Sequence, residues 1–312
     1  MAGYTLRRLV EAIPIWIAIT LVTFLLMNWI PGDPVAQLMD SRSGAMDKQA
    51  IENIREQWGL NDPLYMQYLR FLQNLATGDL GTSYQSRANV TDVVLERIPV
   101  TIQVTCLGLL FAIVFGVTLG ILAAIFRGSW LDSVVSAISI GGVSLPSFFL
   151  GLVLMYLFAV RWQLLPSTGY EAGSLKFLLL PAVTLGLAVG GVLARITRSS
   201  MVEVLKMDYM TTAHAKGIRH SRIILLHALK NALPPILTII GVQMGLLLSG
   251  AVITETIFGL PGIGRLLIDG ILQRDLPVVQ GCVVFIATVF LLVNLIADVL
   301  CSWVDPRVKA KS

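Results

Sequence analysis

The stretch DYMTTAHAKGIRHSRIILLHALKNALPP, residues 208–235, is the longest polar run between hydrophobic blocks in the last two thirds of the chain. Four Lys or Arg residues and three histidines lie in it, around a single glycine at position 217. Apolar blocks long enough to cross a bilayer flank it, near residues 177–194 and 232–254. A polar run held between two such blocks predicts a loop that joins two membrane spans.

The composition of the whole chain is that of a membrane protein with several spans. Of its 312 residues, 55% are hydrophobic and 13% are charged, and the mean hydropathy is +0.78. A soluble domain carries about 25% charged residues. The first apolar block is too long for the core of a cleavable signal peptide, so we expect it to stay as a membrane helix.

Six apolar blocks are long enough to span a bilayer, and in lipid each must be helical because its backbone groups have no water to bind. The predicted fold is therefore an all-α membrane protein with six transmembrane helices. The blocks lie near residues 9–30, 100–126, 133–160, 177–194, 232–254 and 277–303. Pro14, Pro146 and Pro181 lie within or at the start of blocks, where we expect neighbouring helices to tolerate a kink. We divide the chain into a tail with the first span, an insertion, a core and a C-terminal tail: residues 1–30, 31–99, 100–303 and 304–312.

The distribution of Lys and Arg over the loops predicts the orientation. With the N-terminus inside the cell, the inner segments are 1–8, 127–132, 195–231 and 304–312, and the outer segments are 31–99, 161–176 and 255–276. The inner segments hold 13 Lys or Arg against 4 Asp or Glu, and the outer segments hold 10 against 13. Both termini and the loop 195–231 are then cytoplasmic. The outer segment 31–99 predicts two short helices with a turn at 58–63, where Asp62-Pro63 is a typical helix start. Its apolar residues at helical spacing are Leu64, Tyr68, Phe71, Leu72 and Leu75.

The sequence lacks the usual motifs of catalysis and cofactor binding. It contains no G-x-x-x-x-G-K-[ST] loop, no H-E-x-x-H, no G-x-S-x-G and no Cys/His cluster, so we expect no catalytic residue, cofactor or metal in this chain and no nucleic-acid partner. Glu11 and Asp298 fall within apolar blocks but near their inner ends. An ion pair at the membrane interface is their expected role, and a proton relay is the alternative.

Polar and small residues inside the apolar blocks have two possible uses. The polar ones line a substrate pathway or make hydrogen bonds between helices, and the glycines let helices pack closely. The candidate pathway residues are Ser139, Ser144, Gln243, Ser249 and Asn294. The glycines lie at 108, 116 and 120, at 141 and 142, at 186, 190 and 191, and at 241 and 245.

The polar loop itself predicts two helices with a bend. One helix runs from Val192 to Lys216, and Gly217 ends it. A second runs from about Ser221 to Leu233 toward the fifth span, with Pro234-Pro235 at the entry of that span. The second helix has an apolar face that we expect to be buried: Ile223, Leu226, Leu229 and Leu233. The basic edge formed by Lys216, Arg219 and Arg222 either follows the positive-inside rule or docks a cytoplasmic partner.

The pattern around Gly217 resembles the cytoplasmic loop of ABC importer permeases, E-A-A-x-x-x-G followed by I-x-L-P. Thr211-Thr212-Ala213 stand at E-A-A, and His227-Ala228-Leu229-Lys230 stand at I-x-L-P. The form T-A-x-A-K-G with H-A-L-K-N-A-x-x-P is similar to the peptide/nickel subgroup, and its B-type member in particular. Other stretches fit in order: residues 6–8, 31–34, 59–83, 144–148, 180–182, 195–198, 208–209, 255–265, 274–277 and 305–307.

This resemblance implies a bacterial inner-membrane permease that is not itself an enzyme. It implies a second permease, two cytoplasmic ATPase subunits that bind ATP and Mg²⁺, and a periplasmic binding protein that delivers a dipeptide or oligopeptide. The ATPase-docking residues it implies are Asp208, Tyr209, Thr211, Thr212, Ala213, Lys216, Gly217 and Arg219. A nickel chelate or glutathione are alternative substrates. An ion-coupled carrier, a membrane-embedded enzyme and a structural scaffold are rival classes, but the ion site or catalytic groups that the first two need are not evident.

Overall fold

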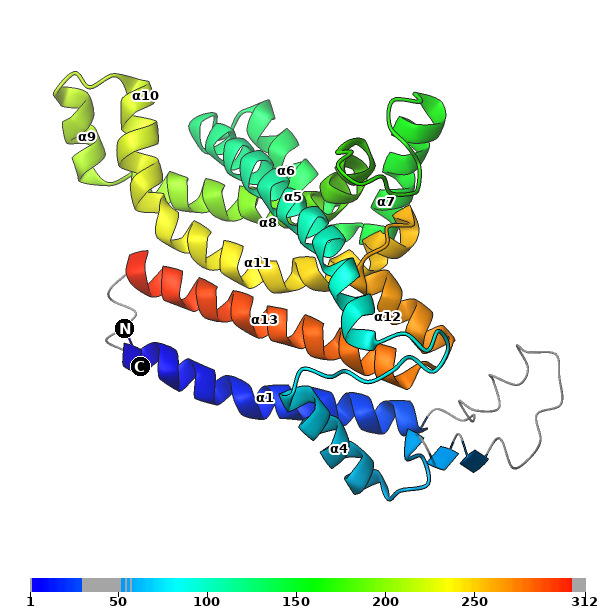
Figure 1. Cartoon of the computed structure of the whole chain (residues 1–312). Helices are drawn as coiled ribbons and strands as arrows, with labels where there is room; N and C mark the ends of the chain where they lie inside the picture. The colour runs from blue at the N-terminus through cyan, green and yellow to red at the C-terminus, as the bar shows by residue number, and fades with distance from the viewer. Residues whose placement is uncertain (1, 30–51, 54, 57, 305–312) are drawn as a thin grey trace. The chain divides into compact units, whose positions relative to one another are not determined.

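The computed structural model describes residues 2–29, 52–53, 55–56 and 58–304, and these residues are almost entirely helical (Figure 1). Their β-structure is one isolated bridge between Thr82 and Asn89. Two of the helical elements, η1 and η2, are π-helical turns. In chain order the elements are α1 (Ala2–Trp29), α4 (Leu64–Ala76), α5 (Val90–Ile125), α6 (Trp130–Ser144), α7 (Ser147–Met155), η1 (Tyr156–Arg161), α8 (Lys176–Leu205), α9 (Asp208–Ala215), α10 (His220–Arg222), η2 (Ile223–Ala228), α11 (Leu229–Phe258), α12 (Ile263–Leu272) and α13 (Leu276–Val304).

Several of these helices are long and apolar enough to cross a membrane. A bent pair, Trp130–Gly142 with Ser147–Arg161, forms one further candidate span, and α1 carries a shorter apolar stretch, Val10–Leu26. An all-helical membrane protein is therefore confirmed, with four or five candidate spans among the described residues. The four unbroken ones are Val90–Ile125, Lys176–Leu205, His220–Phe258 and Leu276–Ile296.

The single helix predicted over 133–160 is wrong, because the chain breaks at Leu145–Pro146. α6 ends at Ser144, Leu145 is extended (φ −81°, ψ 132°), and α7 begins after Pro146. The two helical segments meet at 108°. A proline disfavours the helical conformation in the residue before it and has no N–H of its own to continue the ladder. The proline thus acts as a break here, where the sequence suggested a tolerated kink.

Residues 101–260 make up most of the larger compact unit, and α8 is packed on several sides within it. Glycines allow α5 to approach α8 closely. A Cβ atom added at Gly116 would lie 2.6 Å from the carbonyl oxygen of Gly190 and 2.7 Å from Cβ of Leu193, and one added at Gly120 would lie 2.5 Å from Cβ of Thr197. The close helix packing predicted from the glycine-rich blocks is confirmed at this contact.

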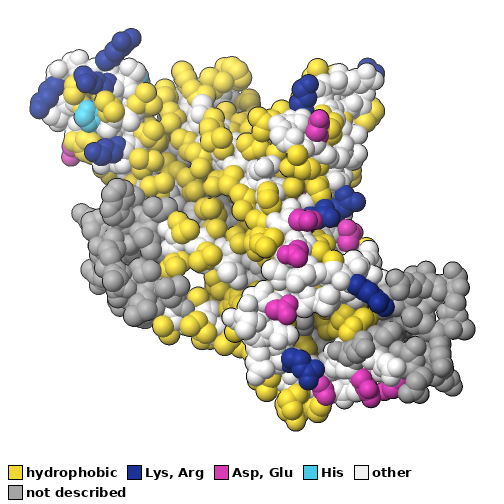
Figure 2. Space-filling view, in the orientation of Figure 1, with side chains coloured by type: hydrophobic (Ala, Val, Ile, Leu, Met, Phe, Trp, Pro, Cys, Tyr) yellow, Lys and Arg dark blue, Asp and Glu magenta, His cyan; other side chains and the backbone are white. Residues whose placement is uncertain are grey.

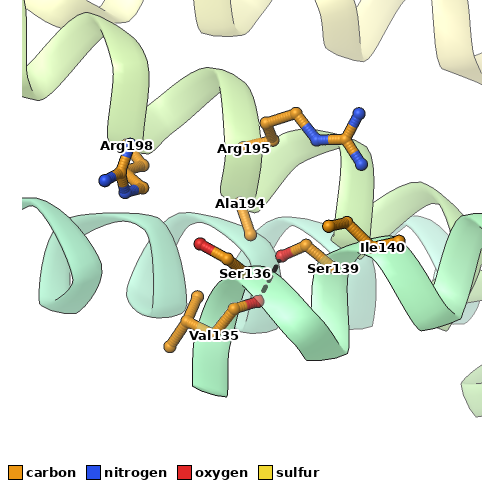
Figure 3. Close-up of a pocket in the computed structure, with 7 residues that line it drawn as sticks. All are labelled: Val135, Ser136, Ser139, Ile140, Ala194, Arg195 and Arg198. Carbon is orange, nitrogen blue, oxygen red and sulfur yellow. Dashed lines mark hydrogen bonds between the residues drawn. The ribbon is translucent and has the colours of Figure 1, made fainter. Parts of the chain in front are cut away.

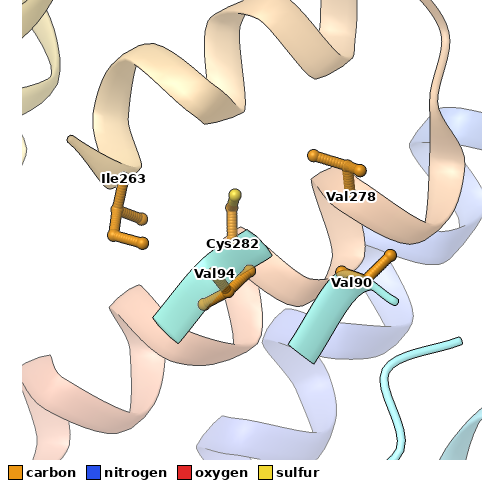
Figure 4. Packing of buried hydrophobic residues seen from close by; sticks show 5 residues of the cluster. All are labelled: Val90, Val94, Ile263, Val278 and Cys282. Atoms are coloured by element: carbon orange, nitrogen blue, oxygen red, sulfur yellow. The ribbon is translucent and has the colours of Figure 1, made fainter. Parts of the chain in front are cut away.

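The second compact unit comprises residues 7–100 and 261–289. Its buried cluster brings the start of α5 together with α12 and α13 (Figure 4). Each of the five members is at most 5% exposed, so the cluster is a small closed core rather than a surface groove. The five are Val90, Val94, Ile263, Val278 and Cys282.

A buried carboxylate holds the loop before α5 within this second unit. Asp275 accepts hydrogen bonds from the Ser83 hydroxyl at 2.5 Å and from the backbone N–H groups of Tyr84 and Gln85 at 3.1 and 3.3 Å. The loop lies far from Asp275 in sequence, so this contact fixes it against the turn between α12 and α13. Burial, together with the nearby Asp275 carboxylate, raises the pKa of Tyr84 to about 12, and the phenol stays neutral at physiological pH.

The helix α4 confirms the second helix predicted in the segment 31–99. It begins at Leu64, one residue after Pro63, and follows a turn at residues 59–61 as expected. Residues 52–53, 55–56 and 58 are helical before that turn. Residues 31–51 of the predicted insertion, with the Pro-Gly-Asp-Pro motif, and residues 305–312 of the predicted tail lie outside the described residues.

The contact between α5 and α8 makes a stability prediction. Gly116→Ala places a methyl group against the α8 backbone, and overpacking of this kind costs about 1–3 kcal/mol. We expect a lower midpoint of thermal unfolding in mild detergent, while Gly141→Ala, whose Cβ meets nothing within 4 Å, leaves the midpoint nearly unchanged. Equal midpoints for the two variants would contradict the contact.

Candidate functional site

The polar loop begins with a break that the sequence did not predict. α8 ends at Leu205, and α9 starts at Asp208 after a turn at residues 206–207. The predicted helix Val192–Lys216 is therefore two helices. Met210 of α9 is 1% exposed, so one side of this short helix is packed against the protein. Asp208 lies in the first turn of α9, where a carboxylate is favoured by the helix dipole.

Gly217 ends α9, as predicted, and does so in the left-handed conformation (φ +70°). The N–H of Ile218 donates to the Ala213 carbonyl at 3.3 Å, and the N–H of Lys216 donates to the Thr212 carbonyl at 3.1 Å. The first of these bonds spans six residues and is the 6→1 bond of a Schellman C-cap, with glycine at the position that favours it. A Cβ at Gly217 would have nothing within 4 Å, so the backbone conformation alone explains the glycine.

The second half of the loop runs straight into the next long helix. The predicted short helix Ser221–Leu233 does not end at Leu233, because α10, η2 and α11 together form one helix, His220–Phe258. Pro234 and Pro235, expected at the entry of a span, lie inside α11. The loop is therefore one short helix and a turn, followed by an extension of a candidate span.

The predicted apolar face of this extension is partly wrong. Ile223 is fully buried, but Leu226 is 55% exposed, and Leu229 and Leu233 are half-buried. The π-helical turn at 223–228 holds more residues per turn than an α-helix. The residues that follow it are therefore rotated relative to the face that a regular helix would bury. The buried side chains are Ile223, Ile224, Ala228, Ala232 and Ile236.

The predicted docking residues lie together on α9 and the turn after it. All are exposed except Ala213, which is half-buried. Figure 2 shows basic side chains gathered at this end of the larger unit, over α9 and α10. The surface thus combines a short, capped helix with positive charge. The exposed members are Asp208, Tyr209, Thr211, Thr212, Lys216, Gly217 and Arg219.

The predicted pathway residues are scattered over three helices of the larger unit. Ser139 and Gln243 are buried, Ser144 and Ser249 are exposed, and Asn294 is half-buried. The side chains of Ser139, Ser249 and Asn294 each donate a hydrogen bond to a carbonyl four residues back in their own helix. In the part of the chain that the structure describes, no hydrogen bond joins two of the five residues. The structure therefore does not bring them together into one substrate pathway.

A cavity of about 350 Å³ lies between α6 and α8, and Ser139 lines it (Figure 3). Arg195 and Arg198 of α8 lie at the same cavity. Arg198 is held by Asp132 in the first turn of α6, with Nε and one terminal nitrogen donating to the two carboxylate oxygens at 2.5 and 2.7 Å. This bidentate ion pair connects the start of α6 to the part of α8 that leads into the loop.

Sequence reasoning missed two acidic residues of the larger unit. Asp132 was counted only as a loop charge, although its pairing with Arg198 fixes two helices. Glu255 was assigned to an outer loop, but it lies in α11 and is 0% exposed, with the Thr101 hydroxyl donating to its Oε1 at 2.6 Å. Glu11 lies in α1, and the side chain of Asp298 lies outside those described, so their predicted ion pair stays a prediction.

Known protein families match this chain over most of its length. Residues 116–310 match the family described as binding-protein-dependent transport system inner membrane component, and residues 1–105 match its N-terminal counterpart. The chain belongs to this family of transport permeases. The loop of α9 and Gly217 lies inside the first match.

Curated relatives are similar to this permease over essentially its full length. It is 39% identical over 311 residues to the glutathione transport system permease protein GsiC of Escherichia coli (strain K12), with 100% of both chains covered. It is 40% identical over 335 residues to the dipeptide transport system permease protein DppB of Alkalihalophilus pseudofirmus, covering 99% of this chain and 100% of the relative. These relatives confirm a B-type ABC permease of the peptide/nickel subgroup.

A solved structure supports the fold. An inward-facing form of the MetNI methionine ABC transporter matches with a TM-score of 0.59 at 20% identity, covering 68% of this chain and 96% of that chain. At this identity the match shows a shared arrangement of helices only.

The left-handed Gly217 makes a prediction about α9 alone. Asn tolerates this conformation better than other residues with a side chain, whereas a β-branched residue is strongly disfavoured there. We expect Gly217→Val to speed amide hydrogen exchange across residues 208–216, and Gly217→Asn to change it far less. The same exchange in both variants would contradict a cap set by backbone conformation.

Proposed function

We propose that this permease and a second, related permease form the translocation pathway for a small peptide delivered by a periplasmic binding protein. The observation that carries the proposal is the exposed loop of α9 and Gly217, held between two candidate spans of a chain that peptide-class permeases match end to end. ATP and Mg²⁺ are bound by two separate cytoplasmic ATPase subunits, and this chain supplies their docking surface.

The docking surface is the exposed face of α9 with the turn after it. A helix of eight residues is short enough to enter a cleft, and its Schellman cap fixes the angle at which the chain turns back. The returning chain is continuous with α11, so a displacement of α9 moves a long helix rather than a flexible linker. Closure of the ATPases would in this way change the packing of the spans, as in other switches that pass movement between packed elements.

The substrate is proposed from the relatives and from peptide chemistry. One relative is named for dipeptides and another for glutathione, which is itself a tripeptide. A dipeptide or oligopeptide is therefore the first candidate, glutathione the second, and a nickel chelate the third. The binding protein makes the main selection, and the pathway residues Ser139, Ser144, Gln243, Ser249 and Asn294 contact the substrate as it passes.

The proposed topology has six spans in the bacterial inner membrane. To the four unbroken candidate spans it adds α1 and the bent pair of α6 and α7. Both termini and the loop 195–231 are cytoplasmic, and the segment 31–99 is periplasmic. The positive-inside distribution of Lys and Arg supports this orientation. The periplasmic surface formed by 31–99 and the turn before α12 meets the binding protein.

Uptake tests this function. Cells or vesicles carrying the complete transporter are expected to accumulate a labelled dipeptide only while ATP is available, and unlabelled peptides are expected to compete. Competition by glutathione but not by dipeptides would move the assignment to the second candidate. Uptake that continues without ATP and follows a proton or sodium gradient would overturn the proposal.

The docking role of α9 has a matched pair of variants. Ala213→Glu adds a bulky charge within the docking set, whereas Ala213→Ser keeps the side chain at the same position small and uncharged. We expect Ala213→Glu to abolish ATP-driven uptake at normal membrane levels and Ala213→Ser to retain most of it. If the first variant transports as well as the second, α9 does not dock an ATPase through this face.

A further inference from the structure

The helix α4 has an exposed flank that is mostly apolar and a second flank that is polar. At about 100° per residue, Tyr65, Met66 and Leu69 fall on one side of the helix together with the exposed Gln73, and Arg70 and Asn74 fall on another. The three apolar side chains are 66, 45 and 51% exposed. Figure 2 shows hydrophobic side chains over α4 at the lower edge of the view, beside charged ones.

A third side of α4 is packed against α1, and its contacts fix the depth of the helix. The Tyr68 hydroxyl shares a hydrogen bond with the Thr20 hydroxyl at 3.0 Å and donates to the Ile17 carbonyl at 3.2 Å. The Tyr68 ring is 5.4 Å from the ring of Phe24. All three partners lie in the middle and outer parts of α1, and Figure 1 shows α4 alongside that region.

These contacts place α4 below the outer surface of the membrane. Thr20 lies nine residues before the end of α1 at Trp29, and a rise of about 1.5 Å per residue puts it about 13 Å from that end. Half the thickness of a hydrocarbon core is about 15 Å. If α1 spans the bilayer, the tip of Tyr68 lies near its middle, and the body of α4 lies at the depth of the outer leaflet.

We propose that α4 is embedded in the outer leaflet against α1, with Tyr65, Met66 and Leu69 in contact with lipid acyl chains. The proposal rests on the membrane-spanning role of α1 in the proposed function. α1 also has exposed apolar residues, such as Ile13 and Val22, that are available to lipid. The part of the segment 31–99 that forms α4 is then a membrane element rather than a purely periplasmic one.

The charges of α4 fit this position. Arg70 is its only ionised side chain, and its guanidinium donates to the Asp62 carboxylate at 2.7 Å. An ion pair costs less to place near the headgroups than a lone charge does. Tyr65, which is 66% exposed at the start of α4, is of a residue type enriched at the membrane–water interface, because its ring prefers the apolar side and its hydroxyl the polar side. The amphipathic pattern is that of a helix lying at a membrane boundary.

A fluorescent probe that reports lipid contact tests the proposal. The native cysteines are replaced by serine, and the full chain in its transporter is placed in nanodiscs with one cysteine at a time: Leu69→Cys, Asn74→Cys or Val22→Cys. Each is labelled with an environment-sensitive dye and exposed to doxyl-labelled phosphatidylcholine or to aqueous iodide. We expect the probe at position 69 to lose most of its emission to the doxyl lipid and little to iodide, with the reverse at position 74.

The third position separates two kinds of failure. The probe at position 22 on α1 is expected to be quenched by lipid, as for a membrane span. If it is quenched by lipid but position 69 is quenched by iodide, α4 lies in water and the proposal is wrong. If position 69 is shielded from both quenchers, a protein partner covers it and the proposal is also wrong. If position 22 is itself quenched by iodide, the spanning role of α1 fails, and the embedding of α4 fails with it.

Discussion

The larger unit depends on how closely its helices can approach α8. Lipid provides no hydrophobic force between helices, so association rests on packing and on hydrogen bonds between them. Each neighbour meets α8 at a glycine: Gly116 of α5 faces Gly190, Gly151 of α7 faces Thr184, and Gly250 of α11 faces Leu185. At α6 both helices supply a glycine, since Gly142 of α6 faces the Leu187 carbonyl and Gly191 of α8 faces the backbone of Ser139.

The polar loop is attached to this packed centre at both ends. α8 leads into α9 through a two-residue turn, and Arg198, about two turns before that point at about 3.6 residues per turn, is paired with Asp132 of α6. After the left-handed Gly217, the chain enters a helix that continues to Phe258 and carries the buried Glu255 near its far end. α9 is therefore joined to α8 and α11 at its two ends. If α9 docks an ATPase as proposed, a displacement of α9 would reach both of these helices.

The sequence was a good guide where one residue type has one physical use. Gly217 was predicted to end a helix, and it does so in the conformation that glycine favours; the glycines of the apolar blocks were predicted to pack closely, and Gly116 and Gly120 do. It failed where tertiary packing decides. Pro146 was expected to kink a span and breaks it instead. The period of Ile223, Leu226 and Leu229 assumed a regular helix, and the π-helical turn removed Leu226 from the buried face. Asp132 and Glu255 gave no local signal, because their partners Arg198 and Thr101 are distant in the sequence.

In the proposed function, the loop of α9 and Gly217 belongs to a permease that works only in an assembly driven by separate ATPases. Affinity purification of the tagged chain in mild detergent, followed by mass spectrometry of the proteins that remain bound, tests this most directly. The account predicts a second permease of the same family and two ATPase subunits that carry the phosphate-binding loop this chain lacks. A chain that purifies alone and still transports without ATP would contradict it.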